Sequence, residues 1–548
     1  MLIALRILDW LLVPLAIIAL AYEPNFAHGA LNYNESGQHL AAIGAMQRGE
    51  LLFRDIFVQY GPLHYYVPFW LFDHLGHSIT TLRGYFLSGE IAGLVAAYGL
   101  ARQLLPTRAF AILAGLAIAM EAHHPFWSTR WGGWRFFFVY VALAAILRFS
   151  ATRNPAWMLA AGLSSTMAFF HTYDAAAAAG IGALVFFAFE FSAYRHQSQA
   201  LANLRRAMAY FVGGILFCAL PLLFYLLTTG TLGDYLGQLP FSATSRAWLQ
   251  PFTSEELTAT VLVPGLIFVV SLGLVGREIL ANRWAKGDTI ALATLIFSGG
   301  LLYFSSFRAI RGPQFESSLP IAIILTAYWL SRAYRLFESS EGDSTLRIQR
   351  WAAFAVLCAA AFALGAGEIR TYAGGAPAWW RYQLNKQHLV PRHVGAVRLD
   401  ESFRVIDIDR AGSARVPRWQ AQEIEGVTRY LRNELQPEEP LFAYPDLGIF
   451  NYFADRPHTS RFQIPILAAS DEGWTSELMD SLATEAPAIV LLGTRRSTLA
   501  IATRYPGEYL PQASDFVREK YQHVGRIGRI EIFRRPSSES AAPHSQGS

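Results

Sequence analysis

The sequence predicts a polytopic α-helical membrane protein with about eleven transmembrane helices, followed by a soluble α/β domain at its C-terminal end. The first observation is composition: 53% of the 548 residues are apolar and 16% are charged, against about 25% charged residues in soluble domains. The second is a series of apolar runs that approach the ~20 residues needed to cross a bilayer. The third is a change near residue 419, where helix and strand patterns typical of a soluble domain replace the long apolar runs.

The expected spans begin near the N-terminus and continue to about residue 367. Their ranges are 6–22, 84–104, 108–122, 134–149, 156–171, 174–193, 208–228, 259–277, 288–305, 318–334 and 350–367. The runs 108–122 and 156–171 are short for a bilayer span, so the expected count varies by one or two. The first run is long for the apolar core of a signal peptide, and no clear Ala-x-Ala site follows it. We therefore interpret it as a retained membrane anchor.

The charge and the cysteines exclude two classes of protein. The net charge of +4 comes mostly from arginines in short loops, without the long basic runs that are typical of nucleic-acid binders. Both cysteines, Cys218 and Cys358, lie inside apolar runs, so the chain cannot be a disulfide scaffold.

Basic residues near the span ends predict the orientation, because such residues concentrate in cytoplasmic loops. With the N-terminus in the cytoplasm, every expected inner loop is basic. The residues concerned are Arg6, Arg102, Arg108, Arg148, Arg153, Arg195, Arg205, Arg206, Arg277, Arg283, Lys286, Arg332, Arg335, Arg347 and Arg350. The sequence therefore predicts a multi-pass protein of the inner (plasma) membrane, with a cytoplasmic N-terminus and a periplasmic C-terminal domain.

Three regions follow from this organisation. We predict a transmembrane domain at 1–367, which includes the outer loop 23–82, an extracytoplasmic α/β domain at 368–535, and a disordered polar tail at 536–548. The elements expected in the second region are a helix at about 419–435, a strand at 441–444, a short helix at 447–453, a helix at 471–484, a strand at 488–493 and a last strand within 528–535.

The most informative segment is 34–68, which follows the first span and is too polar to cross a membrane. Its Glu35 precedes a helical pattern that begins near Ser36. A carboxylate at a membrane–water boundary is able to take a proton from a hydroxyl nucleophile, so Glu35 is a candidate general base. The alternative is structural, because the helix macrodipole favours an acidic residue at a helix N-terminus.

Two other pairs of charged or polar residues are candidates for substrate contact. Arg54 and Asp55 are adjacent, and they either brace their loop or face a polar substrate. His171 and Asp174 lie between two apolar runs, and ionisable groups at a membrane edge are costly enough to suggest a function. A polar hairpin tip is the alternative for this second pair.

Arginines in expected outer loops are candidates for binding a lipid-linked phosphate, because a guanidinium can hold phosphate through two hydrogen bonds. Arg308 and Arg311 are three residues apart, which would place them on one helical face. Arg130 and Arg135 form the second candidate pair, among tryptophans that are expected at a bilayer interface. Anchoring to lipid headgroups is the alternative for these two.

We assign no metal site from the sequence. His39 and His64 in the first loop, and Glu121, His123 and His124 in the next, carry ligand-type side chains. A lone histidine is more often an interfacial or hydrogen-bonded side chain, and we interpret His39 and His64 in that way. No cofactor is assigned, and a divalent metal ion is left open.

The stretch NESGQHLAAIGAMQRGELLFRDIFVQYGPL carries a resemblance to a known family. It is similar to the pattern of acid, helix, G-x-x-x-Y-R-D and Y-x-P-L in the polytopic bacterial GT-C glycosyltransferases. This class includes the dolichyl-phosphate-mannose protein mannosyltransferases and the aminoarabinose lipid A transferases. The motif similarity covers about forty residues, whereas the layout of first helix, large outer loop with two surface helices, further spans and periplasmic C-terminal domain covers nearly the whole chain.

The resemblance implies that region 1–367 is catalytic and moves a sugar from a polyprenyl phosphate to an acceptor hydroxyl, with inversion at the anomeric carbon. The acceptor is a lipid, a glycan or a protein side chain, and no nucleic acid takes part. The Asp-Glu pair of the family stands here as Asn34-Glu35. Glu35 is therefore the nearest carboxylate for the role of base, and Asp55 is the reserve candidate.

Two other classes of function remain open from the sequence. A transporter or flippase for a lipid-linked glycan would also have many spans and scattered arginines, but the large outer loop, the exported domain and the lack of detectable repeat halves count against it. A non-catalytic assembly protein of the cell envelope would use its C-terminal domain to bind partners. Loss of turnover on mutation of Glu35 separates an enzyme from both.

Overall fold

The computed structural model describes residues 7–76, 78–121, 134–239, 259–281, 287–306, 317–338, 383–392, 395–493 and 510–536. They form two compact units. Unit 1 comprises Met1–Phe26, Arg83–Tyr225 and Leu249–Arg398, and unit 2 comprises Ala27–Leu82, Leu226–Trp248 and Leu399–Ser548. Most of the first loop and the chain from Leu399 onward thus belong to the same unit, although most of the helical bundle lies between them in the sequence.

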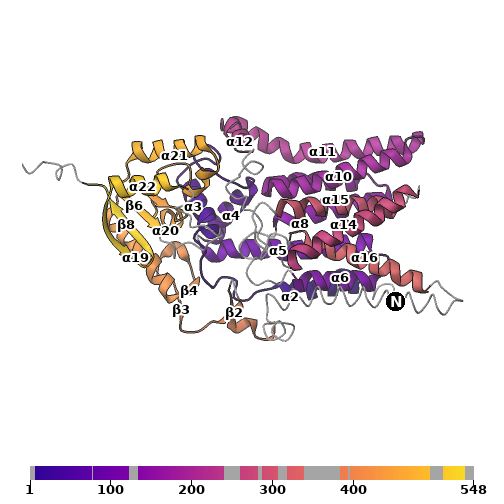
Figure 1. Ribbon diagram of the computed structural model, residues 1–548, viewed down its shortest axis with the longest axis horizontal. Helices are drawn as coiled ribbons and strands as arrows, with labels where there is room; N and C mark the ends of the chain where they lie inside the picture. Colours follow the sequence, from indigo (N-terminus) through magenta and orange to yellow (C-terminus); the bar gives the residue numbers. More distant parts are fainter. Residues whose placement is uncertain are drawn as a thin grey trace, which may run out of the picture. The chain divides into compact units, whose positions relative to one another are not determined.

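The long helices belong largely to unit 1 (Figure 1). A π-helical turn, Leu8–Leu12, leads into the first of them. The helices are α2 (Val13–Ala21), α5 (Ile79–Leu104), α6 (Arg108–Glu121), α8 (Trp134–Thr152), α9 (Ala156–His171), α10 (Tyr173–Tyr194), α11 (Ser198–Thr228), α14 (Ala259–Leu280), α15 (Gly287–Ser306) and α16 (Leu319–Glu338). All the expected spans up to 318–334 correspond to helices, and 350–367 lies outside the described residues.

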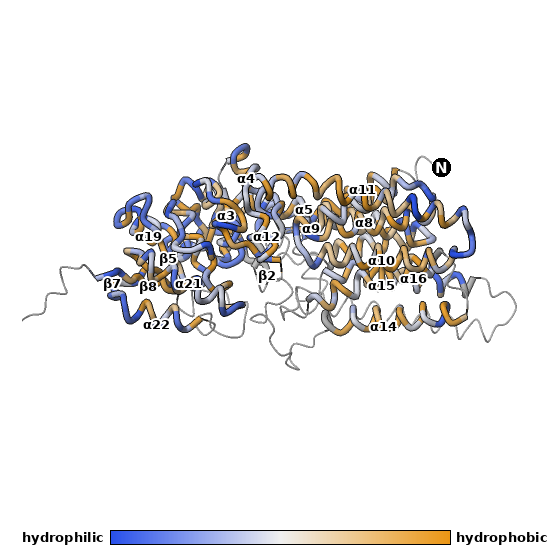
Figure 2. Tube along the Cα trace, turned by 90° about the horizontal axis from the view of Figure 1, so that it is seen from above, coloured by the Kyte–Doolittle hydropathy of each residue, from blue (hydrophilic) through white to orange (hydrophobic). Residues whose placement is uncertain are grey.

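Within the described residues, six helices are long and apolar enough to cross a membrane, and Leu8–Ala21 and Arg108–Met120 are shorter apolar helices. Figure 2 shows the apolar residues that dominate α8, α10 and α11. The chain is therefore a multi-pass membrane protein. Small residues let some of these helices approach closely: a Cβ on Gly162 of α9 would lie 2.0 Å from the Phe211 carbonyl oxygen of α11.

Several of the arginines that predict the orientation are paired with buried acids in unit 1. Asp9, 2% exposed, accepts from Arg102 at 3.2 Å and from Arg108 at 2.8 Å. Glu190, 1% exposed, accepts from Arg153 at 2.5 Å. Burying a carboxylate without such partners would be costly, so these pairs hold the helix ends in register.

Unit 2 combines helices of the outer loop with the C-terminal α/β domain. The loop supplies α3 (Glu35–Gln47) and α4 (Leu63–Leu75), and a later segment supplies α12 (Leu232–Gln238). The domain contains α19 (Arg418–Glu434), β5 (Leu441–Tyr444), α20 (Ile449–Ala454), α21 (Glu472–Glu485), β6 (Ile489–Gly493), α22 (Pro511–Lys520), β7 (Gln522–Ile527) and β8 (Ile530–Arg534). In Figure 1, α3 lies beside α20, and α20 contacts α19.

The sheet of unit 2 has the strand order β5-β6-β8-β7. Strands β5 and β6 are parallel, with Leu441 opposite Ile489, and β8 runs antiparallel to β6.

Five of the predicted elements are confirmed to within two residues, but the last strand is only half of the β7–β8 hairpin. β7 is missing from the prediction because its edge position leaves its residues largely exposed, without an apolar pattern. Helix α22 and the short pair β3 (Phe403–Val405) with β4 (Arg415–Pro417) are also absent from the prediction, as is the pair β1 (Leu389–Arg392) with β2 (Gly395–Arg398), which belongs to unit 1.

Backbone hydrogen bonds join the outer loop to the C-terminal domain within unit 2. The amide of Gly29 donates to the Arg415 carbonyl at 2.8 Å, and the amide of Phe57 donates to the Arg461 carbonyl at 2.7 Å. The Phe57 ring also contacts Phe462 and Trp474, with ring centroids 5.1 and 4.8 Å away. The sequence predicts that the loop and the domain lie on the same face of the membrane. Direct contacts between them, such as these, require that arrangement.

Two buried titratable groups of unit 2 have opposite effects on stability. Burial raises the pKa of Asp446 to about 7, so between about pH 4 and pH 7 the folded protein holds a proton that the unfolded chain releases. Burial, with the charge of Arg48, lowers the pKa of His458 to about 3, so between about pH 3 and pH 6.5 the unfolded chain holds the additional proton. As the pH falls through this range, Asp446 therefore adds stability and His458 removes it.

We expect single substitutions to reveal how each of these two groups makes stability depend on pH. Relative to wild type, Asp446→Asn should lose on the order of 2 kcal/mol of stability as the pH falls from 6.5 to 4.5, and His458→Gln should gain about as much. Thermal unfolding of the full-length protein in detergent, followed by tryptophan fluorescence at several pH values, measures this. Parallel pH profiles for wild type and both variants would contradict the prediction.

Candidate active site

Glu35 is the first residue of α3, one position before the predicted helix start. The Asn32 side chain caps this end of the helix, because its Oδ1 accepts from the amides of Asn34 at 3.0 Å and Glu35 at 3.2 Å. Glu35 is only 7% exposed. Its carboxylate thus occupies the first turn of the helix, where the macrodipole favours negative charge.

A cluster of aromatic and imidazole rings lies one turn into the same helix. The Nδ1 of His39 donates to the Glu35 carbonyl at 2.9 Å, and its ring stacks on Tyr65 at 5.4 Å. The His64 ring lies 4.7 Å from that of His39, and Tyr60 lies 4.6 Å from His64. Both histidines are 1% exposed. Their packing and the His39 hydrogen bond agree with the interpretation of hydrogen-bonded side chains.

Asp55 stabilises a turn. Its Oδ2 accepts from the Leu51 amide at 2.9 Å, and its Oδ1 lies 3.3 Å from the Nε of Arg54, whose side chain is half exposed. The sequence leaves two roles open for this pair, bracing the loop or facing a substrate. These contacts directly support bracing. Asp55 thus has a structural role in a turn, whereas Glu35 stands at the start of a helix.

Gln238, which lies on α12, holds this turn and is not among the site residues predicted from the sequence. Its Nε2 donates to the Phe53 carbonyl, and its Oε1 accepts from the Val58 amide at 3.3 Å. Phe53 has a left-handed backbone with φ of 76° and packs its ring 4.7 Å from Tyr235. Gln238 is 180 positions from Val58, so no local sequence pattern could predict this contact.

Three other predicted site residues come together in unit 1. Arg135, in the first turn of α8, lies 3.4 Å from Asp174, in the first turn of α10. His171, the last residue of α9, stacks on Phe138 of α8 at 5.4 Å. The Arg135 and Asp174 side chains are 9% and 22% exposed. The predicted hairpin tip thus forms a largely buried corner that contains a cation, an anion and an imidazole.

The remaining predicted arginines, Arg130, Arg308 and Arg311, lie outside the described residues. The chain that follows Arg311 re-enters the described part at Ser317, whose carbonyl accepts from the Tyr140 hydroxyl of α8 at 3.2 Å. Ser317 therefore contacts the same helix that carries Arg135. Among the described residues, no group of three or more His, Cys, Asp or Glu side chains is placed to hold a metal ion.

No family model and no curated protein matches the sequence. Solved structures do match its fold. The archaeal oligosaccharyltransferase AglB from Archaeoglobus fulgidus, in complex with an inhibitory peptide and a dolichol-phosphate, matches with a TM-score of 0.50 and 15% identity, over 98% of this chain and 75% of AglB. ArnT from Cupriavidus metallidurans in the apo state matches with a TM-score of 0.50 and 13% identity, over 97% of this chain and 98% of ArnT.

Both matches extend over nearly the whole chain, so they include the helices as well as the C-terminal domain. At this level of identity the likeness concerns the fold. It confirms the predicted class, which combines a polytopic helical part with a C-terminal region of strands and helices. The chain therefore has the GT-C fold that ArnT and AglB share.

Proposed function

We propose that this protein is an integral-membrane glycosyltransferase that moves a sugar from a polyprenyl-phosphate donor to an acceptor hydroxyl at the extracytoplasmic face. The observation that carries the proposal is the position of Glu35. It begins a capped, buried helix in the first outer loop of a chain that has the GT-C fold over its length. A fold alone does not determine a function, and this carboxylate supplies the chemistry.

In the proposed reaction, Glu35 takes the proton of the acceptor hydroxyl as its oxygen attacks the anomeric carbon. The bond to the donor phosphate breaks on the opposite side of the sugar, which inverts the anomeric configuration. The leaving polyprenyl phosphate gains negative charge in the transition state. Cations that contact the phosphate more strongly at that stage, for which Arg135, Arg308 and Arg311 are the candidates, would accelerate the reaction selectively.

A lipid-linked donor suits a multi-pass membrane protein, because the polyprenyl tail stays in the bilayer while the phosphate and sugar reach the surface. AglB, which has the same fold, was solved with a dolichol-phosphate. We assign the loop and the C-terminal domain to the periplasmic face of the inner membrane, on the basis of the basic inner loops. Arg54, His171 and Asp174 remain candidates for contacting the sugar or the acceptor.

The test is transfer by the purified, full-length protein in lipid nanodiscs, with radiolabelled polyprenyl-phosphate sugars and a membrane extract as the source of acceptors. We expect label from at least one donor to appear on a new lipid, glycan or protein product. The same label crossing the bilayer of sealed vesicles without forming a product would instead indicate a transporter. Absence of both activities with every donor would contradict the proposal and favour an assembly protein.

A further inference from the structure

The segment that leads into Glu35 is held by a side chain of the C-terminal domain. The amide of Leu31 donates to Gln420 Oε1 at 2.8 Å, and Gln420 Nε2 donates to the Leu31 carbonyl at 2.8 Å. Both residues are 1% exposed, and 389 positions separate them. The glutamine amide thus satisfies both backbone groups of Leu31, as the backbone of a neighbouring strand would.

One turn further along α19, Glu423 holds the same segment through Tyr33. The Tyr33 hydroxyl donates to Glu423 Oε1 at 2.7 Å, and both residues are 2% exposed. Burial and the charge of Glu423 raise the pKa of Tyr33 well above its ordinary value, so the hydroxyl keeps its proton and donates. A buried carboxylate needs partners of this kind, which makes the bond costly to lose.

The β7–β8 hairpin fixes the Glu423 carboxylate from the other side. Its Oε2 accepts from the Arg529 amide at 2.6 Å, and the Arg529 guanidinium lies 3.3 Å from Oε1 and 4.1 Å from the Trp419 ring. At the hairpin turn, Gly528 has φ of +59°, and a Cβ there would lie 2.3 Å from Glu423 Oε2. Only glycine leaves room for the carboxylate in this place.

Between Leu31 and Tyr33 stands Asn32, whose side chain caps the Glu35 amide. The two contacts with α19 therefore fix the residue that sets the start of α3. The body of α3 also packs closely on α20, where a Cβ on Gly37 would lie 3.3 Å from the Ile449 Cβ. The contacts with α19 and α20 thus fix the N-terminal end of α3, which carries Glu35, relative to the C-terminal domain.

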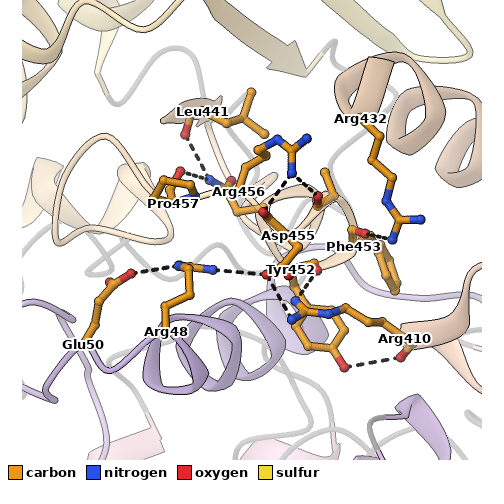
Figure 3. A network of polar contacts seen from close by, with 12 residues as sticks. Arg48, Glu50, Arg410, Arg432, Leu441, Tyr452, Phe453, Asp455, Arg456 and Pro457 are labelled. Carbon is orange, nitrogen blue, oxygen red and sulfur yellow. Dashed lines mark hydrogen bonds and ion pairs between the residues drawn. The ribbon is translucent and has the colours of Figure 1, made fainter. Parts of the chain in front are cut away.

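The opposite end of α3 is held as well, which keeps the helix from pivoting. Figure 3 shows Arg48, the residue after α3, between Glu50 and Asp455. Asp455 also accepts from Arg410 at 3.0 Å, and the Arg410 guanidinium lies 5.0 Å from the centre of the Tyr452 ring.

We propose that Gln420 and Glu423 are positioning residues for Glu35, so that the C-terminal domain sets the place of the carboxylate by clamping residues 31–33. This inference rests on the proposed function, because it takes Glu35 as the base of the transfer reaction. Displacement of a catalytic group by about 1 Å can lower a rate a hundredfold, so loosening this clamp should act on the chemical step.

The experiment compares Gln420→Ala and Tyr33→Phe with Glu425→Gln in the full-length protein. Glu425 is a matched control on α19, because it also accepts from an arginine, Arg404, and from a backbone amide, that of Asp407, at 2.8 Å. We expect the two clamp variants to lower kcat about tenfold to a hundredfold, with KM for the donor within about twofold, and the control to leave both unchanged. Combined with Glu35→Gln, the clamp variants should cause no further loss, since the group they position is already inactive.

Hydrogen exchange provides a readout that does not depend on a donor. In Gln420→Ala, the amides of residues 31–38 should exchange faster, while α21 and the β5–β8 sheet stay protected. Unchanged exchange at 31–38, or an equal further loss of rate in the Glu35→Gln background, would overturn the positioning role. Full turnover by Glu35→Gln itself would instead overturn the proposed base, and with it the purpose of the clamp, whether or not exchange changes.

Discussion

Replacement of Glu35 by glutamine is expected to lower the rate of sugar transfer by about a hundredfold to ten-thousandfold, which is the usual contribution of a general base. Glutamine keeps the size of the side chain and its place at the start of α3, but it cannot take the proton of the acceptor. Donor binding should therefore be nearly unchanged. Single-turnover transfer at saturating donor, with a parallel measurement of donor affinity in nanodiscs, separates the two effects.

Asp55→Asn is the matched control for this prediction, because Asp55 is the other carboxylate proposed in the same loop. Its contacts with the Leu51 amide and with Arg54 indicate a structural role, and an asparagine oxygen is still able to accept from the amide. We expect less than about a tenfold loss of rate. The roles of the two residues would be exchanged if Asp55→Asn abolished transfer while Glu35→Gln did not.

Replacement of Arg135 by alanine is expected to have the second largest effect, on both stability and donor binding. It removes a cation that lies 3.4 Å from Asp174, whose side chain is 22% exposed, and the loss of such a partner should cost about 1 to 3 kcal/mol. If Arg135 also contacts the donor phosphate, affinity for the donor should fall by about tenfold to a hundredfold. Thermal unfolding and equilibrium binding of a polyprenyl phosphate measure the two quantities.

Asp174→Asn distinguishes the two roles of Arg135. It breaks the same ion pair and should lower stability in the same way, but it keeps the guanidinium. Donor affinity should then be retained or increased, since less negative charge competes with the phosphate for Arg135. Equal loss of donor affinity in Arg135→Ala and Asp174→Asn would show that the pair is only structural. Gly180→Ala on α10, where a Cβ would have nothing within 4 Å, is a control for substitution in this helix.

Local patterns in the sequence predict those parts of the fold whose cause is local. The apolar runs become helices because a bilayer core leaves the backbone no partners outside its own helix. β5 and β6 are readable as short runs because both strands are fully buried. β7 has no such signal, since its exposed edge position places no demand on its side chains. The candidate base is also a local feature, because Glu35 stands where a polar loop turns into a helical pattern.

Composition and local periodicity are enough to predict a membrane protein with an acidic first loop and a separate C-terminal α/β region, because both are properties of a few turns of the chain. The way in which that loop is held depends on contacts between residues far apart in the sequence. Gln420 and Glu423 contact Leu31 and Tyr33 over separations of 389 and 390 positions. Arg135 meets Asp174 because α9 returns the chain, so that the first turns of α8 and α10 lie at the same end. Such contacts depend on which surfaces pack together. The sequence around a single polar residue on an amphipathic helix does not indicate which distant residue it will contact.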